Sequence, residues 1–171
     1  MTSIIDDVRE IVLLMRERTD GVVPHFIPGH RREINNILLN EGQDRIAGPL
    51  RYPLLTLFTP FDVINQNGLR EITLNIGIFE STDKNYTTEE RNEYVIKPVL
   101  YPLYELFFDC IRESGLFFWP NDLEMPLHTQ VDRPLWSIEE REGRVAHILT
   151  DPLDAVLIRD LKLNQLLRTC K

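Results

Sequence analysis

The chain has 171 residues, of which 43% are hydrophobic and 27% are charged, and its formal net charge is −8. This length suits one domain with a single substantial core, and the composition is that of a folded protein rather than a disordered one. The acidic balance argues against nucleic-acid binding, which relies on clustered lysine and arginine. No apolar run is long enough to predict a transmembrane helix.

The two cysteines, Cys110 and Cys170, do not form the spaced set that is typical of a small secreted domain with disulfides. The first residues are acidic, where a signal peptide would be basic. We therefore expect a protein that is synthesised in the cytoplasm, has no membrane partner, and uses Cys110 as a small core residue.

The N-terminal segment 1–20 predicts an amphipathic helix. Apolar residues recur at three-to-four spacing from Ser3 to Arg18, and Ser3 is a suitable N-cap. A short strand is expected at 22–27 and a second helix at 31–39. The segment 40–51 holds two glycines and a proline and is expected to be a loop.

The middle of the chain predicts two strands. The apolar run 52–58 is short and therefore fits a buried strand, and segment 69–80 alternates apolar with polar residues at a period of two. The polar segment 81–88 follows and is expected to be a loop.

A long helix is predicted after this loop. Thr87 and Glu90 match a capping box, and the helical pattern runs from there to about residue 113. Pro98 and Pro102 interrupt the pattern one turn apart. Proline lacks a backbone N–H and clashes with the preceding turn, so the pattern predicts a kink, or a helix that begins near Pro98.

Strands are also predicted at 123–131 and 153–163, and the charged segment 137–150 between them is expected to be a mobile loop. Strand pairs without an intervening helix favour an antiparallel sheet. The sequence therefore predicts one α+β domain spanning 1–171, with a mostly antiparallel sheet packed against two or three helices.

The four histidines are candidate metal ligands and catalytic groups. His25 and His30 flank a Pro-Gly turn, but a zinc site needs three or four ligands, and no cysteine or Glu-x-x-His pattern accompanies them. His147 falls in the charged loop. His128 lies near Asp132 in a predicted strand, and this pair is the basis of an alternative hypothesis of a small enzyme or ligand-binding domain.

Motifs for nucleophilic catalysis and phosphate binding are absent from the sequence. There is no Gly-x-Ser-x-Gly, Cys-x-x-Cys, Walker or Gly-x-Gly-x-x-Gly pattern. Asp151, Asp154 and Asp160 do not form a pair of defined geometry for acid–base chemistry. The sequence therefore predicts a protein that is not an enzyme, with no catalytic, cofactor-binding or metal-binding residues and no cofactor.

Large aromatic residues lie beside several predicted loops. Two interpretations stay open: they cover the open edge of the sheet, or some of them face a neighbouring subunit, because interfaces are enriched in aromatic residues. The residues are Phe26, Phe61, Phe117, Phe118, Trp119 and Trp136.

Several short strings between Phe26 and Leu163 occur in a characteristic order. They are Gly29-His30 with residues 33–38, residues 52–58, residues 82–86 with Glu90-Arg91, residues 97–104, His128-Thr129 with Asp132-Arg133 and Trp136, and Asp154-Ala155. Together they resemble a family of phage-encoded and prophage-encoded virion proteins similar to tail-terminator or tail-completion (neck) proteins. The chain departs from the family pattern at Ser137, where a glycine is usual, and in the more charged segment 139–144.

This resemblance implies a compact α+β domain that assembles into a ring at the neck or upper tail of a bacteriophage particle. The implied partners are copies of the same chain and neighbouring neck, portal-side or tail proteins, and the implied location is the virion. Segments 81–88 and 137–150 are the expected assembly loops. Viral DNA would pass through the lumen without specific binding, because acidic side chains repel phosphate.

Overall fold

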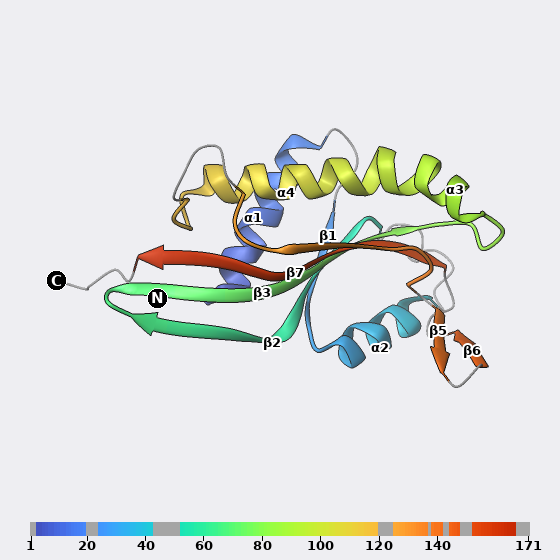
Figure 1. The fold of residues 1–171 in the computed structure, drawn as a ribbon, viewed down its shortest axis with the longest axis horizontal. Coiled ribbons are helices and arrows are strands. Elements are labelled where there is room, and N and C mark those ends of the chain that lie inside the picture. The colour runs from blue at the N-terminus through green and yellow to red at the C-terminus, as the bar shows by residue number, and fades with distance from the viewer. Residues whose placement is uncertain are drawn as a thin grey trace.

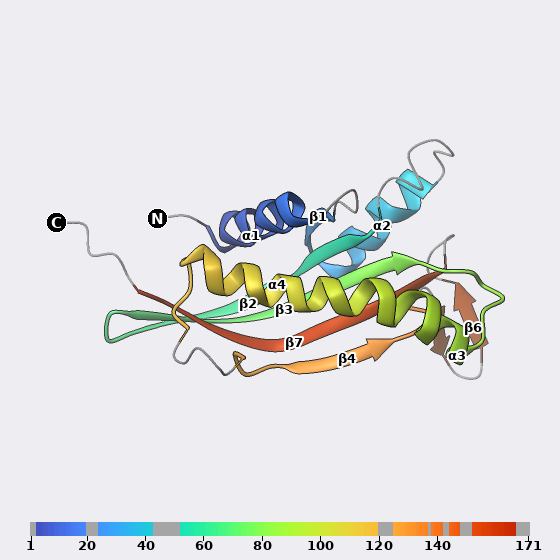
Figure 2. The same cartoon turned by 90° about the horizontal axis from the view of Figure 1, so that it is seen from above.

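The computed structural model describes residues 3–19, 24–42, 52–119, 125–136, 138–141, 144–147 and 152–166. It shows a twisted five-stranded sheet in the order β1-β2-β3-β7-β4, with helices on both faces (Figures 1 and 2). β1 and β2 are parallel, and the other neighbouring strands are antiparallel. The predicted single α+β domain with a mostly antiparallel sheet is confirmed.

The helices are α1 (Ile4–Arg18), α2 (Arg31–Gly42), α3 (Thr88–Arg91) and α4 (Tyr101–Ser114), and the π-helix η2 (Asn92–Leu100) joins α3 to α4. The strands of the main sheet are β1 (His25–Gly29), β2 (Leu54–Gln66), β3 (Leu69–Ser81), β4 (Thr129–Arg133) and β7 (Leu153–Leu166). A separate hairpin consists of β5 (Ile138–Arg141) and β6 (Arg144–His147).

Helix α1 forms as its sequence predicts. The Ser3 side chain accepts a hydrogen bond from the Asp6 N–H, which satisfies one of the free donors of the first turn. The apolar stripe of α1 is buried against the sheet, and the buried carboxylate of Asp7 accepts a bond from Gln165 Nε2 at 2.8 Å. The helix therefore ties the N-terminal segment to the end of β7.

The long helix begins at the predicted capping box, in which the Thr87 side chain accepts from the Glu90 N–H and Glu90 accepts from the Thr87 N–H. It continues through Pro98 to Ser114. The alternative that the helix begins near Pro98 is therefore wrong. The turn around Pro98 is a π-helix, whose wider hydrogen-bonding pattern accommodates a residue that has no N–H. Gly115, in the left-handed conformation with φ of 63°, ends the helix.

One face of the sheet, here called the covered face, packs against α1, η2 and α4 (Figures 1 and 2). This packing forms the larger hydrophobic core, and Cys110 is fully buried in it, as expected. The strands contribute alternate residues to this core, as the period of two requires. They are Leu55, Leu57, Ile72, Leu74, Ile76, Ile78, Val156, Ile158, Leu161 and Leu163.

The opposite face, here called the open face, is covered by α2 at one end of the sheet (Figure 1). Phe58, Phe79 and Trp136 pack edge to face or tilted there, with ring centroids 5.3–6.4 Å apart. Gly77 lies beneath them, and a Cβ at this position would come within 2.4 Å of the Phe79 ring. The glycine therefore leaves the space that the Phe79 ring occupies over the sheet.

The structure differs from the prediction in segments 137–150 and 123–131. Segment 137–150, expected as a mobile loop, contains the antiparallel hairpin β5–β6. Of the strand expected at 123–131, residues 125–128 are not in a strand, and β4 begins at Thr129 and pairs with β7. Residues 123 and 124 lie outside the described residues.

The strand predicted at 52–58 extends to Gln66, where Asn67 and Gly68 make a tight turn into β3 with φ angles of 51° and 77°. Positive φ at both central residues is the geometry that Asn-Gly favours in two-residue hairpins. This hairpin produces a long extension of the sheet.

Candidate assembly surface

The sheet is irregular at Asn75, because the strands on both sides of this residue shift register there. β2 shifts register between Phe58 and Asp62, and β7 places Arg159 and Asp160 opposite the single residue Asn75. Asp160 takes a positive φ of 53° in this bulge, and its N–H donates to Asn75 Oδ1 at 3.1 Å. The bulge keeps the flanking residues of β7 in the core while Arg159 stays exposed.

Beyond this junction the three central strands continue as an extension that we call the arm, formed by residues 61–66, 69–74 and 161–166 (Figure 2). Directly opposed residues share a face of a sheet, so the strand register assigns the side chains to faces. One face of the arm belongs to the hydrophobic core. The other face continues the open face.

Four large apolar side chains gather on the open side of the arm, and together we call them the arm face. Leu69 pairs directly with Leu166, Ile64 pairs with Glu71, and Glu71 in turn pairs with Asn164. Phe118 forms an isolated antiparallel bridge with Asn164, so its ring lies on the same side. Ile64, Leu69, Phe118 and Leu166 are exposed by 56, 40, 53 and 70%, respectively.

The arm face also contains an acidic group at its centre. Glu71 stands between Ile64 and Asn164 on adjacent strands, and it has no ion-pair partner among the described residues. Isolated exposed apolar residues are common on monomeric proteins, whereas a contiguous group of large ones marks an interaction site. The arm face is therefore a candidate interface.

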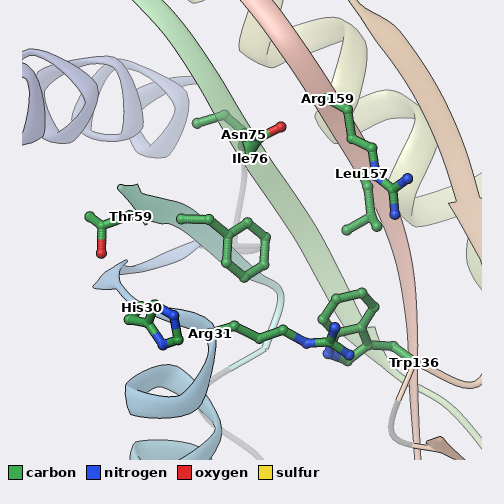
Figure 3. Close-up of a pocket in the computed structure, with 9 residues that line it drawn as sticks. His30, Arg31, Thr59, Asn75, Ile76, Trp136, Leu157 and Arg159 are labelled. Carbon is green, nitrogen blue, oxygen red and sulfur yellow. The ribbon is translucent and has the colours of Figure 1, made fainter. Parts of the chain in front are cut away.

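A partly open cavity of about 250 Å³ lies on the open face between α2 and the arm (Figure 3). Apolar side chains form its base and basic side chains stand at its rim. Arg31 extends from the start of α2, and Arg159 extends from the bulge of β7 on the other side (Figure 3). The full lining is His30, Arg31, Phe58, Thr59, Asn75, Ile76, Trp136, Leu157 and Arg159.

Trp136 is the central aromatic residue beside this cavity. The Arg31 guanidinium stacks 4.4 Å from its ring centre, and Arg133 lies 5.7 Å away on the same indole. The start of α2 is held by His30, whose Nδ1 accepts a bond from the Arg32 N–H. Arg31 and Arg159 thus place two guanidinium groups at the cavity, in a chain whose net charge is −8.

A buried ion pair positions Trp136 from the other side of the sheet. Arg91 lies 3.1 Å from the Asp154 carboxylate, and both side chains are at most 2% exposed. The same carboxylate oxygen accepts from the Leu135 N–H at 3.0 Å, and Trp136 N–H donates to the Leu153 carbonyl at 2.8 Å. Leu135 has a positive φ of 54°, so a strained turn is held in place by these two bonds.

Arg91 also fastens segment 81–88, one of the two expected assembly loops. Its guanidinium donates to the Tyr86 and Asp83 carbonyls and to the Thr82 hydroxyl. These bonds hold the loop against the domain. Its part in assembly stays a prediction, as does that of segment 137–150, whose side chains lie outside the described residues.

His128 and Asp132, the basis of the alternative hypothesis, each bind different partners. His128 Nδ1 donates to the Pro126 carbonyl at 2.6 Å, which leaves Nε2 to accept from the Tyr104 hydroxyl, also at 2.6 Å. Burial raises the pKa of Tyr104, so the phenol stays protonated as the donor. The imidazole packs against the ring of Phe108.

The Asp132 carboxylate accepts from the Tyr101 hydroxyl at 2.5 Å and from Gln130 Nε2 at 3.0 Å. This hydrogen bond raises the pKa of Tyr101, with burial adding to the effect. Two tyrosines of α4 therefore anchor the segment around β4, one through His128 and one through Asp132. The geometry gives both residues a structural role between strand and helix.

The other candidate groups stay apart. His25 begins β1 and His30 precedes α2, while the side chain of His147 lies outside the described residues. Among the residues that the structure describes, no three His, Cys, Asp or Glu side chains gather as a metal site would require. No described helix is long and apolar enough to cross a membrane.

The aromatic residues that the sequence singled out lie in different parts of the structure. Phe117 is buried in the larger core and Trp119 packs against it, whereas Phe118 between them is exposed on the arm face. Trp136 is buried beside the cavity. Sequence reasoning missed Ile64, Leu69 and Leu166, and the Asn67-Gly68 hairpin turn is the signal that would have placed the first two at one tip.

No protein-family model matches the chain, and no curated protein matches its sequence. The resemblance to phage neck proteins therefore stays a prediction.

Proposed function

We propose that the chain is a structural subunit of a ring at the neck or upper tail of a bacteriophage particle, and that it acts by self-assembly rather than catalysis. Its partners are copies of itself and neighbouring neck, portal-side or tail proteins. The phage setting rests on the resemblance of the ordered strings between Phe26 and Leu163. The assembling role rests on the structure.

The arm face is the observation that supports assembly. Ile64, Leu69, Phe118 and Leu166 come from different segments, yet the sheet register brings them onto one side, where each is at least 40% exposed. Burying such side chains contributes roughly 25 cal/mol per Å² of apolar surface. A subunit of a particle gains this free energy when it assembles, and a protein that works alone does not.

The acidic balance of the chain agrees with a DNA-conducting ring. With a net charge of −8, a ring of copies has a strongly negative surface, and a negative lumen repels the phosphates of passing DNA. We propose that DNA passes through without specific binding. A structure of the assembled ring with a mainly basic or apolar lumen would contradict this part of the proposal.

The experiment is sizing of the full chain by native mass spectrometry across a range of concentrations, combined with electron micrographs of the largest species. We expect a single defined copy number above two, and averaged images with cyclic symmetry and a central hole. Immunogold labelling of a purified phage particle should place the protein at the neck or upper tail. A chain that stays monomeric at every concentration and is missing from the particle would overturn the proposal.

A further inference from the structure

We propose that the arm face of one copy docks into the basic cavity of the next copy, with Glu71 of the first pairing with Arg159 of the second. This inference rests on the proposed function and specifies its contact. The arm face and the cavity are two separate parts of the open face, so a one-way contact between them joins copies head to tail, as a ring requires.

The two surfaces are complementary in charge. Glu71 lies between Ile64 and Asn164 on the arm face, and Arg159 lines the cavity together with the apolar side chains of Phe58 and Leu157. Arg159 is exposed, and like Glu71 it has no ion-pair partner among the described residues. Each surface therefore holds a charge without an ion-pair partner among the described residues, and these two charges are opposite in sign.

The rest of the charge distribution favours the same pairing. Asp62 lies on the same side of the arm as Glu71, opposite Thr73. Lys162 lies on that side too, so acidic residues outnumber basic ones there. Arg31 adds a second guanidinium at the cavity. Because copies with a net charge of −8 repel one another, association needs a local contact of opposite signs, and the basic cavity supplies it.

The size of the cavity fits side chains of a partner protein. Its volume of about 250 Å³ is at the small end of ligand pockets, which usually measure roughly 300–1,000 Å³. One or two apolar side chains of the arm would fill it. Phe58 and Leu157 provide apolar contacts at its base, beside the buried ring of Trp136.

The direction of the contact decides the assembly. If two copies exchanged arms reciprocally, both arms and both cavities would be satisfied and growth would stop at a dimer. If each arm enters the cavity of a further copy, growth continues, and it ends in a ring when the rotation between neighbouring copies closes on itself. The proposed function requires the second arrangement.

A charge swap tests the contact. In the full chain, Arg159→Glu and Glu71→Arg should each raise the apparent dissociation constant of the assembly at least tenfold, measured by native mass spectrometry and light scattering. The double variant should return it to within about threefold of the original, because the opposite charges then face each other in exchanged positions. Arg112→Glu, which makes the same charge change on α4 of the covered face, should have no such effect.

Circular dichroism and denaturant unfolding of every variant establish that the fold is retained, which is expected because both charges are at least partly exposed and lack partners. Recovery in the double variant supports the contact. If Arg159→Glu leaves assembly unchanged while Phe118→Ser dissociates the assembly, the contact between arm face and cavity is overturned. The proposed ring is not affected by that result. If the original chain forms only dimers, and the charge swap changes their dissociation constant as expected, the contact is supported and the proposed ring is overturned.

Discussion

The two faces of the sheet are built differently. On the covered face, α1, η2 and α4 bury a continuous core whose members are almost entirely inaccessible to solvent. On the open face, α2 covers a small aromatic cluster at one end, and the arm leaves Phe118 and Leu166 more than half exposed. The covered face accounts for the stability of the isolated chain, and the open face has apolar surface that folding leaves in contact with water.

This difference separates two roles within one sheet. Residues of β3 alternate between the faces, so Ile72 and Leu74 are buried while Glu71 and Thr73 point the other way. Substitutions on the covered face should lower the free energy of unfolding. Substitutions on the arm face should leave it nearly unchanged and alter association. The following experiments test this division.

The largest effect is expected at the buried ion pair beneath the covering helices. Arg91→Met leaves the Asp154 carboxylate buried without its cation and removes the bonds that fasten segment 81–88. We expect a loss of about 3–5 kcal/mol in the free energy of unfolding, measured with urea. Arg112→Met is the matched control, because it breaks an exposed pair with Asp109 that contributes less than about 1 kcal/mol. Equal losses in both variants would contradict the assignment.

Two phenylalanines give a direct comparison of the faces. Phe107 is 1% exposed in the core, so Phe107→Ala should cost about 3 kcal/mol or more in unfolding free energy. Phe118 is 53% exposed on the arm face, and Phe118→Ala should cost less than about 1 kcal/mol. The order should reverse for association, with Phe118→Ala weakening the oligomer. A large loss of unfolding free energy in Phe118→Ala would show that the arm face supports the monomer.

A smaller effect is expected where β4 is anchored to α4. Tyr104→Phe removes the hydroxyl that donates a hydrogen bond to His128 Nε2. The substitution keeps the contact between this ring and Phe108. The expected loss is about 1 kcal/mol in the free energy of unfolding. A much larger loss would mean that this bond does more than hold strand to helix.

The same anchor predicts a weak dependence on alkaline pH. Burial raises the pKa of Tyr104, and the bond to Asp132 raises that of Tyr101, so the folded chain favours the neutral phenols more than the unfolded chain does. Their contribution is complete below the ordinary tyrosine pKa of 10.0 and is lost as the pH rises above it. Unfolding curves between pH 8 and 11 should show this fall, and Tyr104→Phe should reduce its slope.

Local patterns predicted much of the fold. The Ser3 cap, the capping box at Thr87 and the alternation along β3 depend on neighbouring residues, and the structure confirms all three. The part of β2 beyond Phe58 was not predicted, because Pro60 ends the apolar run and proline is rare inside strands. The residues after Pro60 are a mixture of polar and apolar residues without a clear strand pattern.

The candidate surface was beyond local patterns for a different reason. The arm face combines side chains of β2, β3, β7 and the bridge at Phe118, and β3 and β7 are neighbours although other strands lie between them in the chain. The cavity likewise joins the start of α2 to the bulge of β7. Residues far apart in sequence meet only through strand order and register, which no single segment determines.

The most direct test of the account is hydroxyl-radical footprinting of the full chain, read by mass spectrometry, in the assembled state and after dilution to monomer. Phe118 and Leu166 should be oxidised several-fold more slowly in the assembly, because a second copy covers the arm face. Leu13 and Tyr94, which are also at least half exposed but lie on α1 and η2, should be oxidised at the same rate in both states. Equal oxidation of Phe118 in both states, or protection confined to Leu13 and Tyr94, would contradict the account.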